Sequence, residues 1–241
     1  MSTNQHIIDC VIIPARGGSK RIPQKNLLPF LGIPMLERSI LLAKSVSANV
    51  IVSSDDEKIL KFASEFEVIA LPREAHLASD MSPTLPVLHH IVTQLLGSSS
   101  DSSLALPLLH AHSTVLCLYP TAMFTERDSI AKACRLLLDN PSSAYIVAIF
   151  SNQKALRSFT LDNEKNIQFL FPQFLTTRSQ DLPLTYNDAG QFYLGFAKSY
   201  ADNIPLLGNK SKGLELEIAH DIDTYQDLAI AQCLKQIIEG K

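Results

Sequence analysis

Short β-branched runs alternate along the chain with segments whose apolar residues recur every three or four positions. The first pattern is typical of buried strands and the second of helices with one inward face. The strand-like runs are residues 7–14, 48–55, 67–71, 114–120 and 144–150. The helical segments are residues 35–45, 56–66, 84–96, 125–138 and 224–239. This alternation predicts an α/β fold with a mostly parallel sheet and helices on both faces.

Two segments interrupt the alternation. Residues 97–113 begin with a serine-rich stretch, which is typical of an exposed loop or flexible insert. Residues 157–174 place two apolar runs around the turn-forming sequence "DNEKN", which predicts a β-hairpin. We therefore expect a single domain over residues 1–241 with a small projecting subdomain, able to take part in dimerisation, around residues 151–185.

Composition narrows the classes of function. The 241-residue chain is 46% hydrophobic, enough for a sizeable core, and its net charge of −3 argues against a nucleic-acid-binding surface. The start of the chain lacks the pattern of a secretory signal, and no apolar run reaches the roughly 18 residues of a membrane helix. The four cysteines, which show no CxxC spacing, are Cys10, Cys117, Cys134 and Cys233. We expect a cytoplasmic protein with reduced, buried thiols.

The loop after the first predicted strand concentrates positive charge in the sequence "VIIPARGGSKRIPQKN", residues 11–26. Gly17, Gly18 and Ser19 allow the backbone to approach a ligand and direct N–H groups at an anion. Four cations accompany them: Arg16, Lys20, Arg21 and Lys25. The segment matches neither the P-loop nor the GxGxxG pattern. A solvated loop is the alternative, but this clustering favours binding of a polyphosphate at the carboxyl end of the strand.

Several later segments, taken in order with this loop, resemble a known family. They are "VSSDDEKI", "LASDMSPT", "LYPTAMF", "TRSQDLPLTYNDAGQFYLG" and "HDIDTYQDL". The set is similar to the cytidylyltransferases that activate acidic sugars, the CMP-sialic acid synthetase group. The combination of "SKRIPQKN", "TRSQDL", "YNDAGQFY" and "DIDT" is most similar to the members that act on pseudaminic acid. The resemblance implies a Rossmann-like nucleotide-diphospho-sugar transferase fold.

The resemblance also implies a reaction. CTP and the anomeric hydroxyl of a nonulosonic acid would give the CMP-sugar and pyrophosphate, for glycosylation of flagellin or surface polysaccharide. By similarity, the nucleotide-binding residues are Ala15, Arg16, Gly17, Ser19, Lys20, Lys25, Asn26, Arg73, Ser79 and Ser82. Arg16 and Lys25 would also be catalytic, because they stabilise charge on the departing pyrophosphate. Alternatively, Ser79 and Ser82 belong to a segment that caps the following helix. Asp55 either contacts the ligand or caps the helix after its strand, and we expect the cap.

Asp221 and Asp223 lie two residues apart in "DIDT", so both carboxylates face one side of an extended segment. With phosphate oxygens they form the hard-oxygen ligand set that Mg²⁺ prefers, so we expect both to be catalytic metal ligands. Alternatively, Asp223 and Thr224 cap the last helix; both roles are compatible when Thr224 is the cap.

By similarity, the sugar-binding residues are Tyr119, Arg178, Gln180, Asp188 and Gln191. Arg178 would bind the sugar carboxylate, and a surface salt bridge is its alternative. Enzymes for sialic acid typically have glutamine before the proline of "LYPT", whereas this chain has Tyr119, a departure that argues against N-acetylneuraminate. A core aromatic role for Tyr119 is the alternative.

Other functions stay open at this point. Within enzymes the alternatives are CMP-N-acetylneuraminate synthesis, CMP-legionaminate synthesis and, fitting less well because that group usually lacks "KN" after the proline, activation of 3-deoxy-octulosonic acid. Outside enzymes the alternative is a catalytically silent nucleotide-sugar binding module. No general base stands out in the sequence. Family members are commonly homodimers whose hairpin reaches toward the partner, so we expect a homodimer here.

Overall fold

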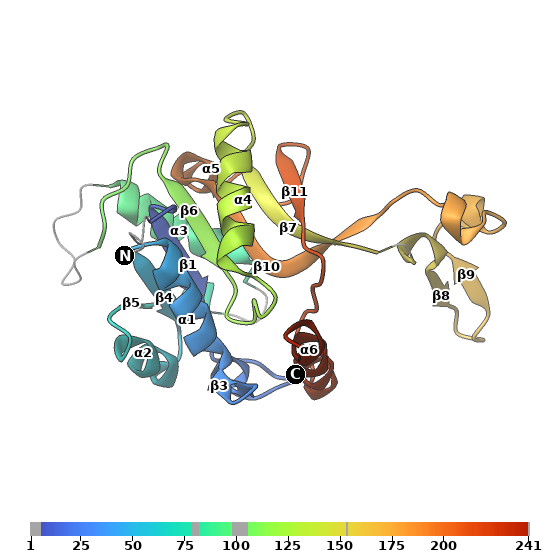
Figure 1. The fold of residues 1–241 in the computed structure, drawn as a ribbon, viewed down its shortest axis with the longest axis horizontal. Helices are drawn as coiled ribbons and strands as arrows, with labels where there is room; N and C mark the ends of the chain where they lie inside the picture. The colour runs from blue at the N-terminus through green and yellow to red at the C-terminus, as the bar shows by residue number, and fades with distance from the viewer. Residues whose placement is uncertain (1–5, 79–81, 98–105, 153, 241) are drawn as a thin grey trace.

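A seven-stranded sheet forms the centre of the molecule (Figure 1). The computed structural model describes residues 6–78, 82–97, 106–152 and 154–240. The strand order in the sheet is β11-β7-β10-β6-β1-β4-β5. Strands β1, β4, β5 and β6 run parallel to one another, whereas β10 is antiparallel to both of its neighbours. The mostly parallel α/β sheet expected from the sequence is thus confirmed.

All five predicted strands are present. They are β1 (Cys10–Pro14), β4 (Val50–Ser54), β5 (Ile69–Pro72), β6 (Thr114–Leu118) and β7 (Tyr145–Ser151). The helices are α1 (Met35–Val46), α2 (Glu57–Ser64), α3 (Thr84–Leu96), α4 (Arg127–Leu138), α5 (Ala197–Ala201) and α6 (Tyr225–Ile238). Only the short α5 was not predicted. Strand β1 begins at Cys10 rather than residue 7, because the preceding residues hydrogen-bond to Val46 at the end of α1.

Two strands of the sheet escaped the sequence prediction: β10 (Tyr186–Phe196) and β11 (Ser211–Glu215). Strand β10 inserts between β6 and β7, and its pairing with β7 shifts register between Asp188 and Tyr193. This irregularity breaks the period-two alternation on which strand prediction depends. Strand β11 forms the sheet edge and carries few apolar residues, so its sequence lacks a strand signal.

Helices cover both faces of the sheet, as predicted (Figure 1). Alternation along β1 sends Val11 and Ile13 to the face covered by α1, α2 and α4, and Cys10 and Ile12 to the face covered by α3 and α5. A third apolar cluster packs α6 against the loop after β1 and includes the fully buried Ile22 and Ile222. This cluster holds the carboxyl-terminal helix against the loop after β1.

Residues 152–185, here called the arm, project from the sheet between β7 and β10 (Figure 1). The predicted hairpin is confirmed: β8 (Phe159–Leu161) pairs antiparallel with β9 (Ile167–Phe169). A second short hairpin, which follows the loop after β1 along the chain, pairs β2 (Pro29–Phe30) with β3 (Ile33–Pro34). Within the predicted insert, residues 97–113, the segment 98–105 lies outside the described residues.

Three of the four cysteines are buried as expected, but Cys233 on α6 is exposed, which corrects the expectation for that residue. Helix α6 packs on the molecule through one narrow face, and Cys233 lies off that face. Among the described residues, no helix has the length and apolar content needed to span a membrane.

Candidate functional site

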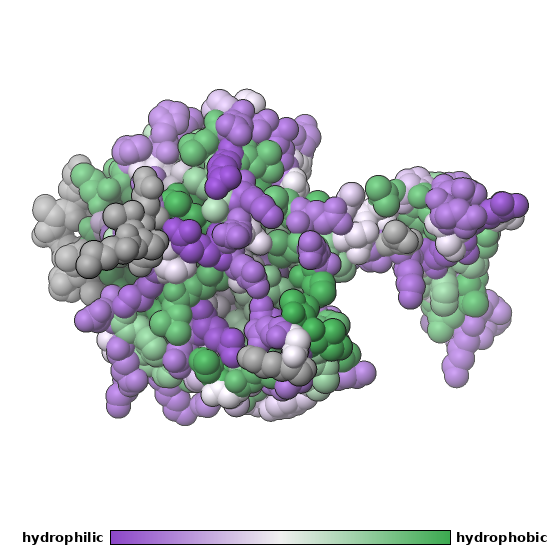
Figure 2. Space-filling view, viewed as in Figure 1, coloured by the Kyte–Doolittle hydropathy of each residue, from purple (hydrophilic) through white to green (hydrophobic). Residues whose placement is uncertain are grey.

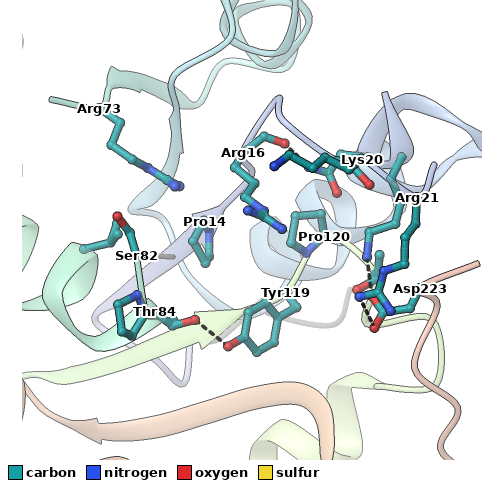
Figure 3. Close-up of a pocket in the computed structure, with 16 residues that line it drawn as sticks. Pro14, Arg16, Lys20, Arg21, Arg73, Ser82, Thr84, Tyr119, Pro120 and Asp223 are labelled. Atoms are coloured by element: carbon teal, nitrogen blue, oxygen red, sulfur yellow. Dashed lines mark hydrogen bonds and ion pairs between the residues drawn. The ribbon is translucent and has the colours of Figure 1, made fainter. Parts of the chain in front are cut away.

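A cavity of about 560 Å³ opens beyond the carboxyl ends of β1, β5 and β6 (Figure 3). Parallel strands bring their following loops together at this edge of the sheet. Eight predicted nucleotide-binding or metal residues line it: Arg16, Ser19, Lys20, Lys25, Asn26, Arg73, Ser82 and Asp223. Tyr119, which was predicted to bind the sugar, lines it as well. Segments separated by about 200 positions therefore share one cavity.

The basic loop is held in place by Asn26. This side chain is 6% exposed, and its Nδ2 donates a hydrogen bond to the main-chain oxygen of Arg16 at 2.9 Å. Asn26 follows Gln24, which has a positive φ of 53°, so the chain turns back sharply at this point. The bond fixes the backbone that carries Arg16. Asn26 lines the cavity, and its position supports the loop from behind.

Gly17 has a different position from the one predicted. Its N–H donates to Asp55 Oδ1 at 3.0 Å rather than facing the cavity. A Cβ atom at Gly17 would lie 2.5 Å from Asp56 Cβ, so only glycine permits this close approach. The expected cap of α2 is also corrected, because Asp56 accepts the Lys58 N–H at 2.8 Å and is the N-cap. Asp55 instead anchors the basic loop to the end of β4.

Asp223 links the carboxyl-terminal segment to the basic loop. Its Oδ2 accepts from Arg21 Nη2 at 2.7 Å and its Oδ1 from Lys25 Nζ at 3.1 Å. Lys25 Nζ also donates to the main-chain oxygen of Ile222 at 2.7 Å. Figure 3 shows Arg21 and Asp223 together at one end of the cavity, with Arg16 and Lys20 beside them. Cations and an acidic group from opposite ends of the chain therefore meet at one point.

Asp221 lies next to this cluster but does not line the cavity. Partial desolvation and the nearby Asp223 carboxylate raise the pKa of Asp221, and Lys25 opposes the rise. Among the described residues, no group of three or more His, Cys, Asp or Glu side chains is placed to hold a metal. Mg²⁺ is commonly bound by one or two carboxylates together with substrate phosphates and water. The Asp221 and Asp223 pair fits such a site.

Arg73 stands at the opposite end of the cavity, near Ser82 (Figure 3). Its Nη2 donates to the main-chain oxygen of Ser53 at 3.0 Å, while its buried Nε has no hydrogen-bond partner among the described residues. Desolvation lowers the pKa of Arg73; the carboxylate of Asp55 raises it and Arg16 lowers it further. A buried guanidinium N–H without a partner is costly, so this end of the cavity is suited to a ligand that supplies an acceptor.

Tyr119 forms part of the cavity wall. Its hydroxyl shares a hydrogen bond of 2.7 Å with Thr84 Oγ1 at the start of α3 (Figure 3). Its ring meets that of Tyr193 edge to face, with centroids 5.9 Å apart. Desolvation raises the pKa of Tyr119, so the phenol is neutral and can donate or accept a hydrogen bond. The position fits a wall that contacts a ligand substituent.

Two other predicted sugar ligands have protein partners. Tyr193 hydroxyl donates to Asp188 Oδ2, and the Gly190 N–H donates to Asp188 Oδ1 at 3.0 Å. Gln191 is completely buried, and its Oε1 accepts the Phe124 N–H at 3.1 Å. Gln191 therefore braces the loop after β6 and does not line the cavity, which corrects its assignment as a sugar ligand.

Arg178 and Gln180 lie on the arm with exposed side chains and do not line the cavity. Ala15 is fully buried, so its contribution is to position the basic loop. Ser79 lies outside the described residues. The structure thus separates the predicted nucleotide and metal residues, which mostly converge, from the predicted sugar residues, which mostly do not.

Sequence reasoning did not assign site roles to Thr84 or Thr121, and it counted Arg21 among the cations of the loop without giving it an individual role; all three line the cavity. Arg21 carried a signal, since it is one of the four cations of the loop. Thr84 is the first residue of α3, and its position in the cavity wall follows only from how that helix packs on the sheet.

Comparison with known proteins identifies the family. The family model described as cytidylyltransferase matches residues 10–201. The chain belongs to the cytidylyltransferase family. Pseudaminic acid cytidylyltransferase of Campylobacter jejuni is 34% identical over 232 residues, covering 94% of this chain and 95% of the relative. A CMP-N,N'-diacetyllegionaminic acid synthase of Legionella pneumophila is 27% identical, covering 94% and 95%.

Solved structures confirm the fold. A CMP:2-keto-3-deoxy-manno-octonic acid synthetase in complex with CTP superposes with a TM-score of 0.66 at 15% identity, covering 96% of this chain and 99% of that one. A 4-diphosphocytidyl-2C-methyl-D-erythritol synthase of Anaerococcus prevotii gives a TM-score of 0.59 at 15% identity, covering 95% and 96%. This cytidylyltransferase therefore has the nucleotide-sugar transferase fold expected from its motifs.

Proposed function

We propose that this cytidylyltransferase transfers CMP from CTP to pseudaminic acid and releases pyrophosphate. The observation that carries the proposal is the convergence of Arg16, Lys20 and Lys25 with Asp223 at one cavity. The choice of sugar is supported by the 34% identity to the pseudaminic acid enzyme, against 27% to the legionaminic acid enzyme over a similar length. Tyr119, which replaces the glutamine expected for sialic acid, agrees with that choice.

In this reaction the anomeric oxygen of the sugar forms a bond to the α-phosphorus of CTP. The bond from that phosphorus to the bridging oxygen breaks, and its electron pair leaves with pyrophosphate. The hydroxyl proton passes to solvent. Negative charge grows on the departing pyrophosphate, and the cations of the basic loop would stabilise that charge. Holding both substrates in one cavity lowers the barrier further, by roughly 7–11 kcal/mol in favourable systems.

The other predicted residues have supporting roles in this proposal. Arg73, Ser79 and Ser82 would bind the nucleoside, and the Arg73 Nε, which has no partner within the described part of the chain, would supply a donor at that end. Asp221 and Asp223 would hold Mg²⁺. A bound Mg²⁺ neutralises phosphate charge and polarises the α-phosphate. Asp188 would hold Tyr193 against Tyr119 rather than contact the sugar directly.

We also propose that the protein is a homodimer, acting in the cytoplasm. The arm exposes six large apolar side chains: Phe159, Leu161, Ile167, Phe169, Leu170 and Leu175. Figure 2 shows hydrophobic surface on the hairpin of the arm. An exposed cluster of this kind is typical of a protein interface. In a dimer, the arm residues Arg178 and Gln180 would reach the sugar end of the partner's cavity.

A substrate panel tests the proposal. Pyrophosphate release is measured with CTP, Mg²⁺ and, in separate reactions, pseudaminic acid, N,N'-diacetyllegionaminic acid and N-acetylneuraminic acid. We expect the highest kcat/KM with pseudaminic acid. A higher kcat/KM with one of the other two acids would change the proposed sugar substrate and leave the proposed cytidylyl transfer in place. CTP binding without turnover on any acid would instead favour a silent nucleotide-sugar binding module.

A further inference from the structure

Asp223 is proposed as a metal ligand, but in this structure its carboxylate is paired with two cations. Both carboxylate oxygens accept hydrogen bonds from cations, Oδ2 from Arg21 and Oδ1 from Lys25. Both cations line the cavity proposed for the triphosphate. We propose that Asp223 is an internal counter-ion for Arg21 and Lys25, which a triphosphate displaces so that Asp223 can bind the metal. The inference rests on the proposed CTP-dependent function and gives Arg21 a change of partner, from the Asp223 carboxylate to the triphosphate.

Charge repulsion prevents Asp223 from binding a metal ion while it is paired with Arg21 and Lys25. A divalent cation at Asp223 would lie beside the Arg21 guanidinium and Lys25 ammonium, which repel it. A triphosphate brings several negative charges, and arginine binds two phosphate oxygens at once. When the phosphates take the two cations, the repulsion is neutralised and the carboxylate is released. Nucleotide and metal therefore bind with positive coupling, and each strengthens the binding of the other equally.

The two cations differ in freedom. Lys25 is 19% exposed and is also held by the main-chain oxygen of Ile222, so its ammonium keeps its position. Arg21 is 64% exposed and approaches Asp223 from the solvent side. An exposed arginine changes partner at little cost, because water solvates it throughout. Arg21 is therefore the residue that moves from carboxylate to phosphate.

Direct CTP binding without metal gives the first test. Calorimetry in EDTA compares wild type with Asp223→Asn, which removes the competing carboxylate charge. Exposed ion pairs are weak, so we expect Asp223→Asn to bind metal-free CTP about two- to tenfold more tightly. Glu217→Gln also removes one negative charge, from an exposed side chain outside this cavity, and should leave the affinity unchanged. Equal or weaker CTP binding by folded Asp223→Asn overturns the proposal.

A double-mutant cycle assigns the effect to Arg21. In an Arg21→Gln background, Asp223→Asn should tighten CTP binding less than it does in the wild-type background, because one of the two competing ion pairs is already absent. Strictly additive effects would exclude exchange at Arg21. Arg21→Gln alone should weaken CTP binding, whereas a purely structural role of Arg21 would leave it unchanged and lower the melting temperature.

Metal binding by the wild-type protein gives a test that needs no variant. Mn²⁺ binding is followed by electron paramagnetic resonance, with and without CTP, after subtraction of the Mn²⁺–CTP complex formed without protein. We expect binding to protein alone to be at least about tenfold weaker than to protein with CTP. Equal Mn²⁺ affinity in both cases overturns the exchange. Failure of wild type to bind CTP at all would overturn the proposed function instead.

Discussion

Gln180 and Gln191 were both predicted to bind the sugar, but the two glutamine side chains lie in different environments. Gln180 is exposed on the arm, whereas Gln191 is completely buried beside β6. The amide of Gln191 accepts the main-chain N–H of Phe124 and donates to the main-chain oxygen of Ala189 at 3.3 Å. A side chain whose polar atoms bond to the backbone fixes local structure and is not available to a substrate.

We predict that Gln191→Leu, which keeps the side-chain volume similar, lowers the free energy of unfolding by about 1–3 kcal/mol. The substitution leaves the buried Phe124 N–H without its acceptor, and that donor cannot reach water. Urea denaturation measures the change. Gln180→Leu is the matched control on the exposed arm and should change stability by less than about 0.5 kcal/mol. Unchanged stability of Gln191→Leu together with a raised sugar KM would restore the sugar-binding interpretation.

At the scale of elements, the start of α6 supports the proposed metal ligand. Thr224 Oγ1 accepts the Asp227 N–H at 3.1 Å, and Asp227 Oδ2 accepts the Thr224 N–H at 2.8 Å, which forms a capping box. Asp227 Oδ2 also accepts the main-chain N–H of Asp223 at 3.1 Å. The cap therefore fixes both the helix and the backbone of Asp223. Thr224 caps the helix while Asp223 stays directed toward the basic loop.

We predict an acid-dependent loss of stability from this cap. Desolvation raises the pKa of Asp227, but hydrogen bonds from Thr224 and Asp223 outweigh this effect and lower the pKa overall. A lowered pKa contributes stability at neutral pH, which is lost as pH falls from the unfolded value of about 3.9 through the folded value. Asp227→Asn should remove about 0.5–2 kcal/mol at pH 7 and less below pH 4.

Chemical denaturation of wild type and Asp227→Asn at several pH values tests this prediction. Asp128→Asn is the control, since Asp128 lies in the first turn of α4 and is not its cap. A difference between wild type and Asp227→Asn that does not shrink in acid would contradict the role of the carboxylate.

The same variant should raise the Mg²⁺ concentration needed for turnover, because Asp223 loses a backbone anchor.

At the scale of the whole molecule, the arm projects away from the central sheet (Figure 1), and none of its described residues lines the cavity. Arg178 belongs to the arm and Asp223 to the cavity, so a site that used both residues would be completed by a second chain, as in the proposed homodimer. A symmetric dimer with exchanged arms would build two such sites, each from both chains. The exposed apolar residues of the hairpin would then be covered.

We predict that two inactive variants restore activity to each other. Arg178→Ala and Asp223→Ala, unfolded and refolded as a mixture, form dimers in which one of two sites receives intact Asp223 and intact Arg178. With random pairing, half of the dimers are mixed and each has one working site, so activity should reach about one quarter of wild type. Pyrophosphate release measures it, and each variant refolded alone is the control. No recovery in mixed dimers confirmed by mass would show that Arg178 does not act on the partner's site.

The sequence alone determined the elements with strong local signals: helices with 3.6-residue periodicity, buried parallel strands, the arm hairpin, and the basic loop after β1. Its ordered motifs also determined the family. These are local properties, because propensity and periodicity act within a few residues. The tertiary structure decided which side chains meet. Only packing placed Asp223 against Lys25, buried Gln191, and inserted the irregular β10 between β6 and β7. Such contacts join residues far apart in the chain, and their energies depend on burial and partners that no local pattern encodes.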